Sequence, residues 1–109
     1  MQEIQVATKL SGMTCTGEPF DELIVEAVWN KANVIPGYNP DYIRKDICGA
    51  AMLRSAYGTT TDYGWEIDHI RPATKDGTDD LHNLQPLHWK NNRHKGDDWP
   101  HWSCAVSSR

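Results

Sequence analysis

The sequence lacks any long apolar stretch. None of its apolar runs approaches the roughly 20 residues that a membrane-spanning helix needs. Its first residues, MQEIQVATKL, also lack the basic segment followed by an apolar segment that marks a secretory signal. We therefore expect a cytoplasmic protein without membrane contacts, and the length of 109 residues predicts a single small domain.

Cysteine is scarce. The three residues, Cys15, Cys48 and Cys104, lie far apart and form no CxxC pair. An odd number of cysteines without metal-ligand spacing argues against a disulfide framework and against a zinc knuckle. We expect three reduced thiols.

The chain also lacks an excess of positive charge. It has 15 acidic and 11 basic residues and a net charge of −4, which is the wrong sign for binding nucleic acid by bulk electrostatics. The basic residues are clustered, however, at Arg44 and Lys45 and again at Lys90, Arg93 and Lys95. A local basic face of this kind predicts modest affinity with a shallow salt dependence.

The clearest local pattern lies in the second half of the chain. Residues 65–70 read as a strand that ends before Pro72, because proline cannot donate to a strand ladder. A second short strand is predicted at residues 84–87, then a helix at 88–95 with Gly96 as its cap. Residues 19–32 carry apolar side chains at helical spacing, whereas residues 42–57 fit a helix or an irregular extended segment equally well.

These patterns divide the chain into three parts. Residues 1–19 are an N-terminal arm with little apolar patterning, which we expect to be flexible. Residues 20–98 form the domain, with a core at 64–98. Residues 99–109 are a tail whose two tryptophans fold back on the body.

The run WEIDHIRPATKDGTDDLHNLQPLHWKNNRHKG, about a third of the chain, resembles the HNH endonucleases, or ββα-metal nucleases, of the small bacterial and phage type. It repeats their order of DH, then NL, then N-R-x-K-G, at Asp68-His69, Asn83-Leu84 and Asn92 to Gly96. The resemblance implies an α+β fold: a single small domain with a hairpin-helix core plus an N-terminal helix. It also implies hydrolysis of DNA that leaves 5′-phosphate and 3′-hydroxyl ends.

The chemistry of phosphodiester hydrolysis asks for these residue types. A histidine of ordinary pKa, near 6.5, can take a proton from water at neutral pH, which makes His69 the candidate general base. Carboxylate and amide oxygens suit a hard divalent cation, so Asp68 and Asn92 are the candidate metal ligands. Mg²⁺ is the default ion, with Mn²⁺ or Ni²⁺ as substitutes. Adjacent strand residues point to opposite faces, so Asp68 and His69 can share a site only where the strand twists or bends.

The resemblance gives the remaining motif residues supporting roles. Asn83 joins His69 and Asn92 in the catalytic set by bracing the loop between the strands. The candidate contacts to nucleic-acid phosphates are Arg71, His88, Lys90, Arg93 and Lys95. His88 stands where many relatives have the first cysteine of a structural zinc pair, and Asn91 where a later one would be. We therefore expect no structural zinc and a core centred on Trp65, Leu87 and Trp89.

Several alternatives remain open at this point. The chain could be a nucleic-acid-binding module that keeps the fold without cleavage, or a structural protein whose polar cluster holds loops together. It could also be a toxin or effector nuclease with an immunity protein as partner. DNA is the expected substrate, and a homodimer is an option where both strands are cut.

Overall fold

The computed structural model describes residues 12–107, which form two small antiparallel sheets and two helices. Strands β4 (Trp65–His69) and β5 (Leu84–His88) pair as a hairpin, with Trp65 opposite His88 and His69 opposite Leu84. Helix α2 (Trp89–Lys95) follows directly and packs on the hairpin. This hairpin-helix unit and the α+β class confirm the fold predicted from the sequence.

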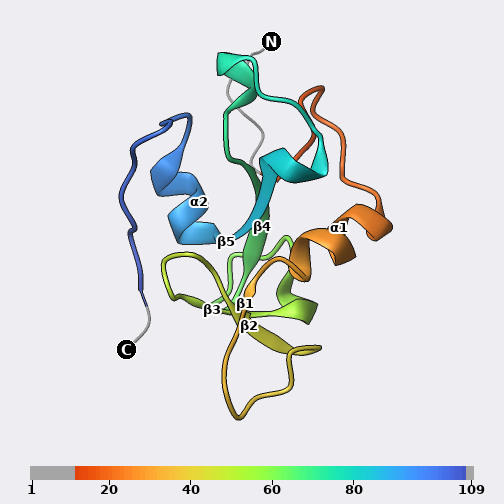
Figure 1. Ribbon diagram of the computed structural model, residues 1–109, viewed down its shortest axis with the longest axis vertical. Helices are drawn as coiled ribbons and strands as arrows, with labels where there is room; N and C mark the ends of the chain where they lie inside the picture. Colours follow the sequence, from red (N-terminus) through yellow and green to blue (C-terminus); the bar gives the residue numbers. More distant parts are fainter. Residues whose placement is uncertain (1–11, 108–109) are drawn as a thin grey trace.

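Helix α1 (Glu22–Trp29) packs against β5, and in Figure 1 it lies on the other side of the hairpin from α2. The carboxylate of Asp21 caps its first turn by accepting from the Leu23 backbone N–H at 2.8 Å. The buried side of the helix meets the hairpin at the indole pair Trp29–Trp65, whose ring centroids are 5.3 Å apart. The two helices thus enclose the hairpin that carries the motif.

The segment that was ambiguous in sequence forms strands. Strands β1 (Asn33–Val34), β2 (Ile43–Lys45) and β3 (Ala51–Leu53) make a three-stranded sheet in the order β1-β2-β3. Each strand is only two or three residues long, so no apolar alternation develops that would reveal it in the sequence. Met52 of β3 is fully buried and joins the core around Trp65.

The core is centred differently from our expectation. Trp65 and Leu87 are fully buried, as predicted, but Trp89 is only partly buried at the surface of α2. Its place in the core is taken by Trp29 and by Tyr57, whose ring lies 4.8 Å from that of Trp65. The Trp89 indole N–H donates instead to the Thr61 carbonyl, in the loop before β4, at 2.8 Å.

The expectation of three reduced thiols is wrong. Cys48 and Cys104 form a disulfide, with their Cα atoms 5.9 Å apart across a sequence separation of 56 residues, while Cys15 is free. Spacing rules detect cysteines that are close in sequence, but this pair meets only because the tail runs back along α2 to the β2–β3 turn. Two backbone N–H groups of the tail, from Ala105 and Val106, donate to the Asn91 side chain of α2.

Within residues 12–107, no helix has the length and apolar character needed to cross a bilayer.

Candidate active site

Strand β4 presents its side chains to two different surroundings. Trp65, Ile67 and His69 point to the side covered by α1, and the His69 ring lies 6.0 Å from that of Phe20. Glu66 and Asp68 point toward α2, where both are bonded to its side chains. Asp68 and His69 nevertheless line one cavity of about 300 Å³, because His69 is the last residue of the strand and the chain turns away after it.

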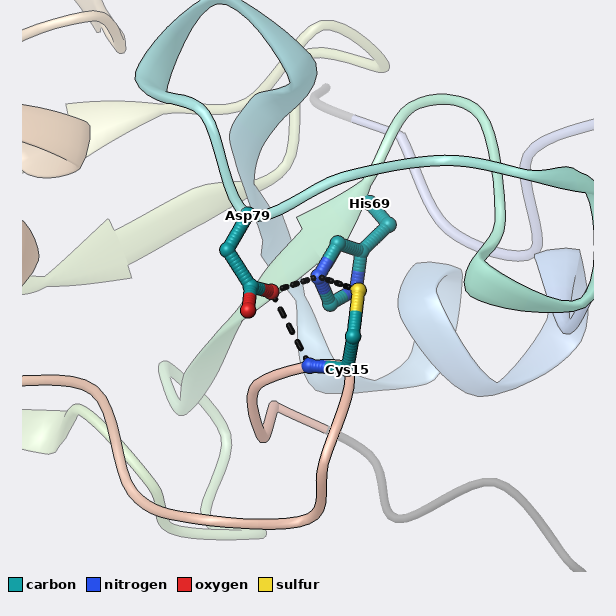
Figure 2. A group of neighbouring side chains, drawn as sticks. All are labelled: Cys15, His69 and Asp79. Carbon is teal, nitrogen blue, oxygen red and sulfur yellow. Dashed lines mark hydrogen bonds and ion pairs between the residues drawn. The ribbon is translucent and has the colours of Figure 1, made fainter.

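His69 is held by a carboxylate that the motif does not contain. Its Nε2 lies 2.7 Å from Oδ1 of Asp79, in the loop between β4 and β5 (Figure 2). Although partial burial opposes it, the hydrogen bonds from His69 and Cys15 hold the pKa of Asp79 below its ordinary value. An ionised carboxylate only accepts, so the proton of neutral His69 resides on Nε2, and Nδ1 keeps the basic lone pair.

The arm reaches this histidine as well. Cys15 Sγ lies 3.6 Å from His69 Nε2, and the Cys15 backbone N–H donates to Asp79 Oδ1 at 2.9 Å (Figure 2). Burial, followed by the hydrogen bond and the charge of Asp79, raises the pKa of Cys15 to about 11, so the thiol keeps its proton at neutral pH. Residues 1–11 of the predicted arm lie outside the described residues, but residues 12–17 form one wall of the cavity.

Two side chains on one face of helix α2 bond the two carboxylates of β4. Asn92 Nδ2 donates to Glu66 Oε1 at 2.8 Å, and Lys95 Nζ lies 3.2 Å from Asp68 Oδ2. All four residues are at most 4% exposed. The orientation of the Asn92 amide leaves its Oδ1 buried without a hydrogen-bond partner among the described residues.

Asn83 braces the loop that carries Asp79. Its side chain accepts from the Arg71 N–H at 2.9 Å and donates to the Arg71 and Thr78 carbonyls at 3.0 and 2.8 Å. A side chain at Gly77 would place its Cβ 1.7 Å from the Arg71 carbonyl oxygen. Only glycine therefore fits where the loop passes this close to the Arg71 backbone. The bracing role expected of Asn83 matches these contacts.

Three of the five predicted phosphate contacts lie at the surface. Arg71 is exposed with its guanidinium 4.9 Å from the Trp99 ring, and Lys90 is exposed with its ammonium 5.6 Å from the Trp89 ring. The Arg93 side chain is about half exposed at 49%, although its Nη2 donates to Glu66 Oε2 at 2.8 Å. That hydrogen bond raises the pKa of Arg93, which stays a cation.

The other two require a correction. Lys95 is 1% exposed and bonds Asp68 and the His69 carbonyl, while His88 is 5% exposed and accepts from the Lys90 N–H through Nδ1. Neither side chain is free to meet a nucleic-acid backbone. Helical spacing placed Lys95 correctly beside the site, but it could not show that this face of α2 is covered by β4.

The place that the resemblance gave to a structural zinc pair is occupied by hydrogen bonds. Oδ2 of the buried Asp46 accepts from the His88 N–H and from Asn91 Nδ2, both at 3.0 Å. The other Asn91 contacts run to the tail next to Cys104. One carboxylate, one amide and one disulfide thus join the β2–β3 turn, α2 and the tail.

Sequence reasoning missed three residues that shape this region: Cys15, Asp46 and Asp79. Glu66, which lies two positions before Asp68 and must share its face of a strand, is an alternative ligand that the sequence already offers. Nothing in the local sequence distinguishes Asp79 from its neighbour Asp80, and Cys15 lies 54 residues from His69. Only the folded loop and arm bring these two to the histidine.

Comparison with known proteins agrees with this geometry. Residues 46–98 match the family described as HNH endonuclease, and this range contains Asp68, His69, Asn83 and Asn92. No curated protein and no solved structure matches the chain.

Proposed function

We propose that this protein, whose residues 46–98 match the HNH endonuclease family, is a metal-dependent endonuclease that hydrolyses DNA phosphodiester bonds with His69 as general base. The observation that carries the proposal is the Asp79–His69 contact of 2.7 Å at the wall of the cavity. It fixes the tautomer in which Nδ1 can accept a proton, which is the requirement for a histidine base.

The proposed step uses the groups of the chain as follows. His69 Nδ1 takes a proton from water, whose oxygen attacks phosphorus. The bond from phosphorus to the 3′-oxygen breaks, leaving a 5′-phosphate and a 3′-hydroxyl that gains its proton from solvent. Asp79 holds the imidazolium that forms, as an ionised carboxylate opposite its Nε2–H.

The donor atoms of the site fit a hard divalent cation, with Mg²⁺ as the default ion. Asp68 is one of the residues that line the cavity, and Asn92 offers a buried amide oxygen that has no hydrogen-bond partner among residues 12–107. These are oxygen ligands of the kind that Mg²⁺ and Mn²⁺ prefer. When bound, such a cation would stabilise the charge that develops on the phosphate and on the leaving oxygen.

The exposed cationic side chains are the proposed contacts to the phosphates of the substrate. Arg71 and Lys90, with the exposed half of Arg93, are available for phosphate contacts that position a duplex without reading its sequence. Each of the three guanidinium or ammonium groups lies over a tryptophan ring, Trp99 or Trp89. These contacts orient long side chains that would otherwise be mobile, and such a surface suits sequence-tolerant cutting.

The test is a plasmid-nicking assay with Mg²⁺ and with EDTA. Wild-type protein should nick supercoiled DNA only with the metal, and His69→Ala should lose at least about 100-fold in rate, because general base catalysis contributes 10² to 10⁴. His82→Ala, which changes an exposed histidine near the same loop, is the matched control and should cut at the wild-type rate. Wild-type cleavage by His69→Ala would overturn the assignment of the base.

The metal ligand is tested separately by calorimetric titration with Mn²⁺. Asp68→Asn is the suitable variant because its amide oxygen can still accept from the buried Lys95, and circular dichroism checks its fold before titration, since Lys95 loses its counter-charge. We expect lost or strongly weakened Mn²⁺ binding. Unchanged affinity would move the ligand role to another carboxylate, Asp97 at the cavity or Glu66 on the same face of β4.

A further inference from the structure

Three different metal-ligating groups meet beside His69. Cys15 Sγ, His69 Nε2 and a carboxylate oxygen of Asp79 all lie within 4.8 Å of one another (Figure 2). They come from the arm, from the end of β4 and from the following loop. Cys15 also lies outside the range matched by the family, so the motif does not account for this cluster.

We propose that Cys15, His69 and Asp79 form a second metal site, selective for Zn²⁺ over Mg²⁺, and that its occupation inhibits the nuclease. The ligand set supports the selectivity. Thiolate and imidazole are ligands for zinc and similar borderline cations, whereas Mg²⁺ takes oxygen ligands and keeps much of its water.

The distances already approach those of a zinc centre. Tetrahedral zinc with ordinary bond lengths places sulfur and nitrogen ligands about 3.6 Å apart, and nitrogen and oxygen ligands about 3.4 Å apart. Cys15 Sγ and His69 Nε2 are 3.6 Å apart, while His69 Nε2 and Asp79 Oδ1 are 2.7 Å apart. The required adjustment is a widening of the second contact by about 0.7 Å, once a cation replaces the proton between the two atoms.

The backbone holds the sulfur in this position without the metal. The Cys15 N–H bonds Asp79, and a tight turn flanks the residue, with Thr14 N–H donating to the Glu18 carbonyl at 2.8 Å. The Glu18 N–H in turn donates to Thr14 Oγ1 at 3.0 Å. Cys15 is exposed and lines the cavity, which leaves a fourth coordination position for water, as in open three-ligand zinc sites.

Inhibition follows from the proton balance, and this step rests on the proposed role of His69. Zinc binding replaces the thiol proton of Cys15, which leaves to solvent, and takes the lone pair of Nε2. Neutral His69 must then carry its proton on Nδ1. The nitrogen that would accept a proton from water becomes a donor, so the base is lost while the fold and the Asp68 side of the strand remain.

Co²⁺ is the spectroscopic probe for the site, used on the disulfide-intact protein without added thiols. Wild-type protein should develop thiolate-to-cobalt charge-transfer absorption that saturates at one ion per chain and is bleached by Zn²⁺. Cys15→Ser keeps the backbone bond to Asp79 but should lose the band and at least about tenfold in zinc affinity. Asp80→Asn, at the adjacent exposed carboxylate, is the control and should bind like wild type.

An absent thiolate band in wild-type protein, or equal zinc affinity for wild type and Cys15→Ser, would overturn the metal site. Inhibition is measured next, as the zinc concentration that halves Mg²⁺-supported nicking. That concentration should rise at least about tenfold in Cys15→Ser. Bound zinc without inhibition would overturn the inhibitory role. The cobalt band is measured without any nuclease activity. If the proposed nuclease function fails, the metal-binding result can therefore still be interpreted.

Discussion

At the scale of single residues, the Cys15 thiol has a raised pKa to which both burial and the carboxylate beside it contribute. Its pKa is raised from 9.0 to about 11, by burial first and then by Asp79. The folded protein therefore keeps a proton that the unfolded chain loses above about pH 9. The contribution of this group to stability is complete below that pH and disappears as the pH rises toward 11.

The raised pKa predicts slow alkylation of Cys15 by iodoacetamide. At pH 8 the thiolate fraction is about 100-fold smaller than for an ordinary thiol, and the greater nucleophilicity of a basic thiolate recovers about tenfold. We expect a rate about tenfold below that of a free thiol in the unfolded chain. The rate is measured by mass spectrometry, which also locates the label.

Asp79→Asn provides the comparison for this measurement. It removes the negative charge beside the sulfur and leaves the burial, so alkylation should accelerate without reaching the unfolded rate. Equal rates for the variant and the wild type would show that Asp79 does not govern the thiol.

At the scale of elements, the β4–β5 loop depends on a single amide. The three Asn83 side-chain bonds hold Arg71 and Thr78, and the loop between them delivers Asp79 to His69. Asn83→Ala should lower the free energy of unfolding by about 2 kcal/mol or more, since buried backbone groups lose their partners. Urea denaturation measures this change in the free energy of unfolding.

Asn83→Asp tests whether Asn83 stabilises the loop through its hydrogen bonds or only through the volume of its side chain. Its carboxylate keeps the volume of the side chain and can accept from the Arg71 N–H, but it cannot donate to the two carbonyls and is buried without a cation, so it should destabilise at least as much as Asn83→Ala. A wild-type unfolding energy for Asn83→Ala would show that the loop stands without its brace.

Helix α2 has two lysines with opposite expected behaviour. Lys95→Met leaves Asp68 buried without its cation and should cost about 3–5 kcal/mol of stability. Lys90→Met, at the exposed position, should change stability by less than about 1 kcal/mol. In DNA binding, Lys90→Met should reduce the slope of affinity against salt by about one phosphate contact.

Thermal unfolding and binding titrations at several salt concentrations measure the two effects on the same pair of proteins. A stable Lys95→Met with weakened DNA binding would reverse the assignment and restore the phosphate contact first expected of Lys95.

At the scale of the whole molecule, the tail is covalently joined to the domain. The Cys48–Cys104 bond closes a loop with a sequence separation of 56 residues, for which the chain-entropy model predicts about 4 kcal/mol of stabilisation. The Cys48→Ser and Cys104→Ser double variant should unfold at correspondingly lower urea concentration. Cys15→Ser, which keeps the disulfide, is the control.

Wild-type protein with its disulfide reduced should have the same stability in urea as the double variant. The Asp46 and Asn91 hydrogen bonds remain in both, so some tail contact should persist without the bond. Equal stability of the double variant and the control would mean that those hydrogen bonds hold the tail unaided.

The sequence by itself determined the hairpin-helix unit and the order of Asp68, His69, Asn83 and Asn92 along it. Strand alternation, a proline at a strand end and a glycine at a helix end are local signals, written within a few residues of the structure they specify. The same locality explains why the resemblance to the HNH endonucleases could be recognised in about a third of the chain.

Only the tertiary structure decided which of these residues are accessible and what surrounds them. Burial of Lys95 and His88 depends on which face of α2 meets the hairpin, and the disulfide depends on the path of the tail. Cys15 and Asp79 reach His69 from segments whose own sequence has no periodic pattern. Contacts between distant segments are set by the packing of the whole core, so no window of the sequence contains them.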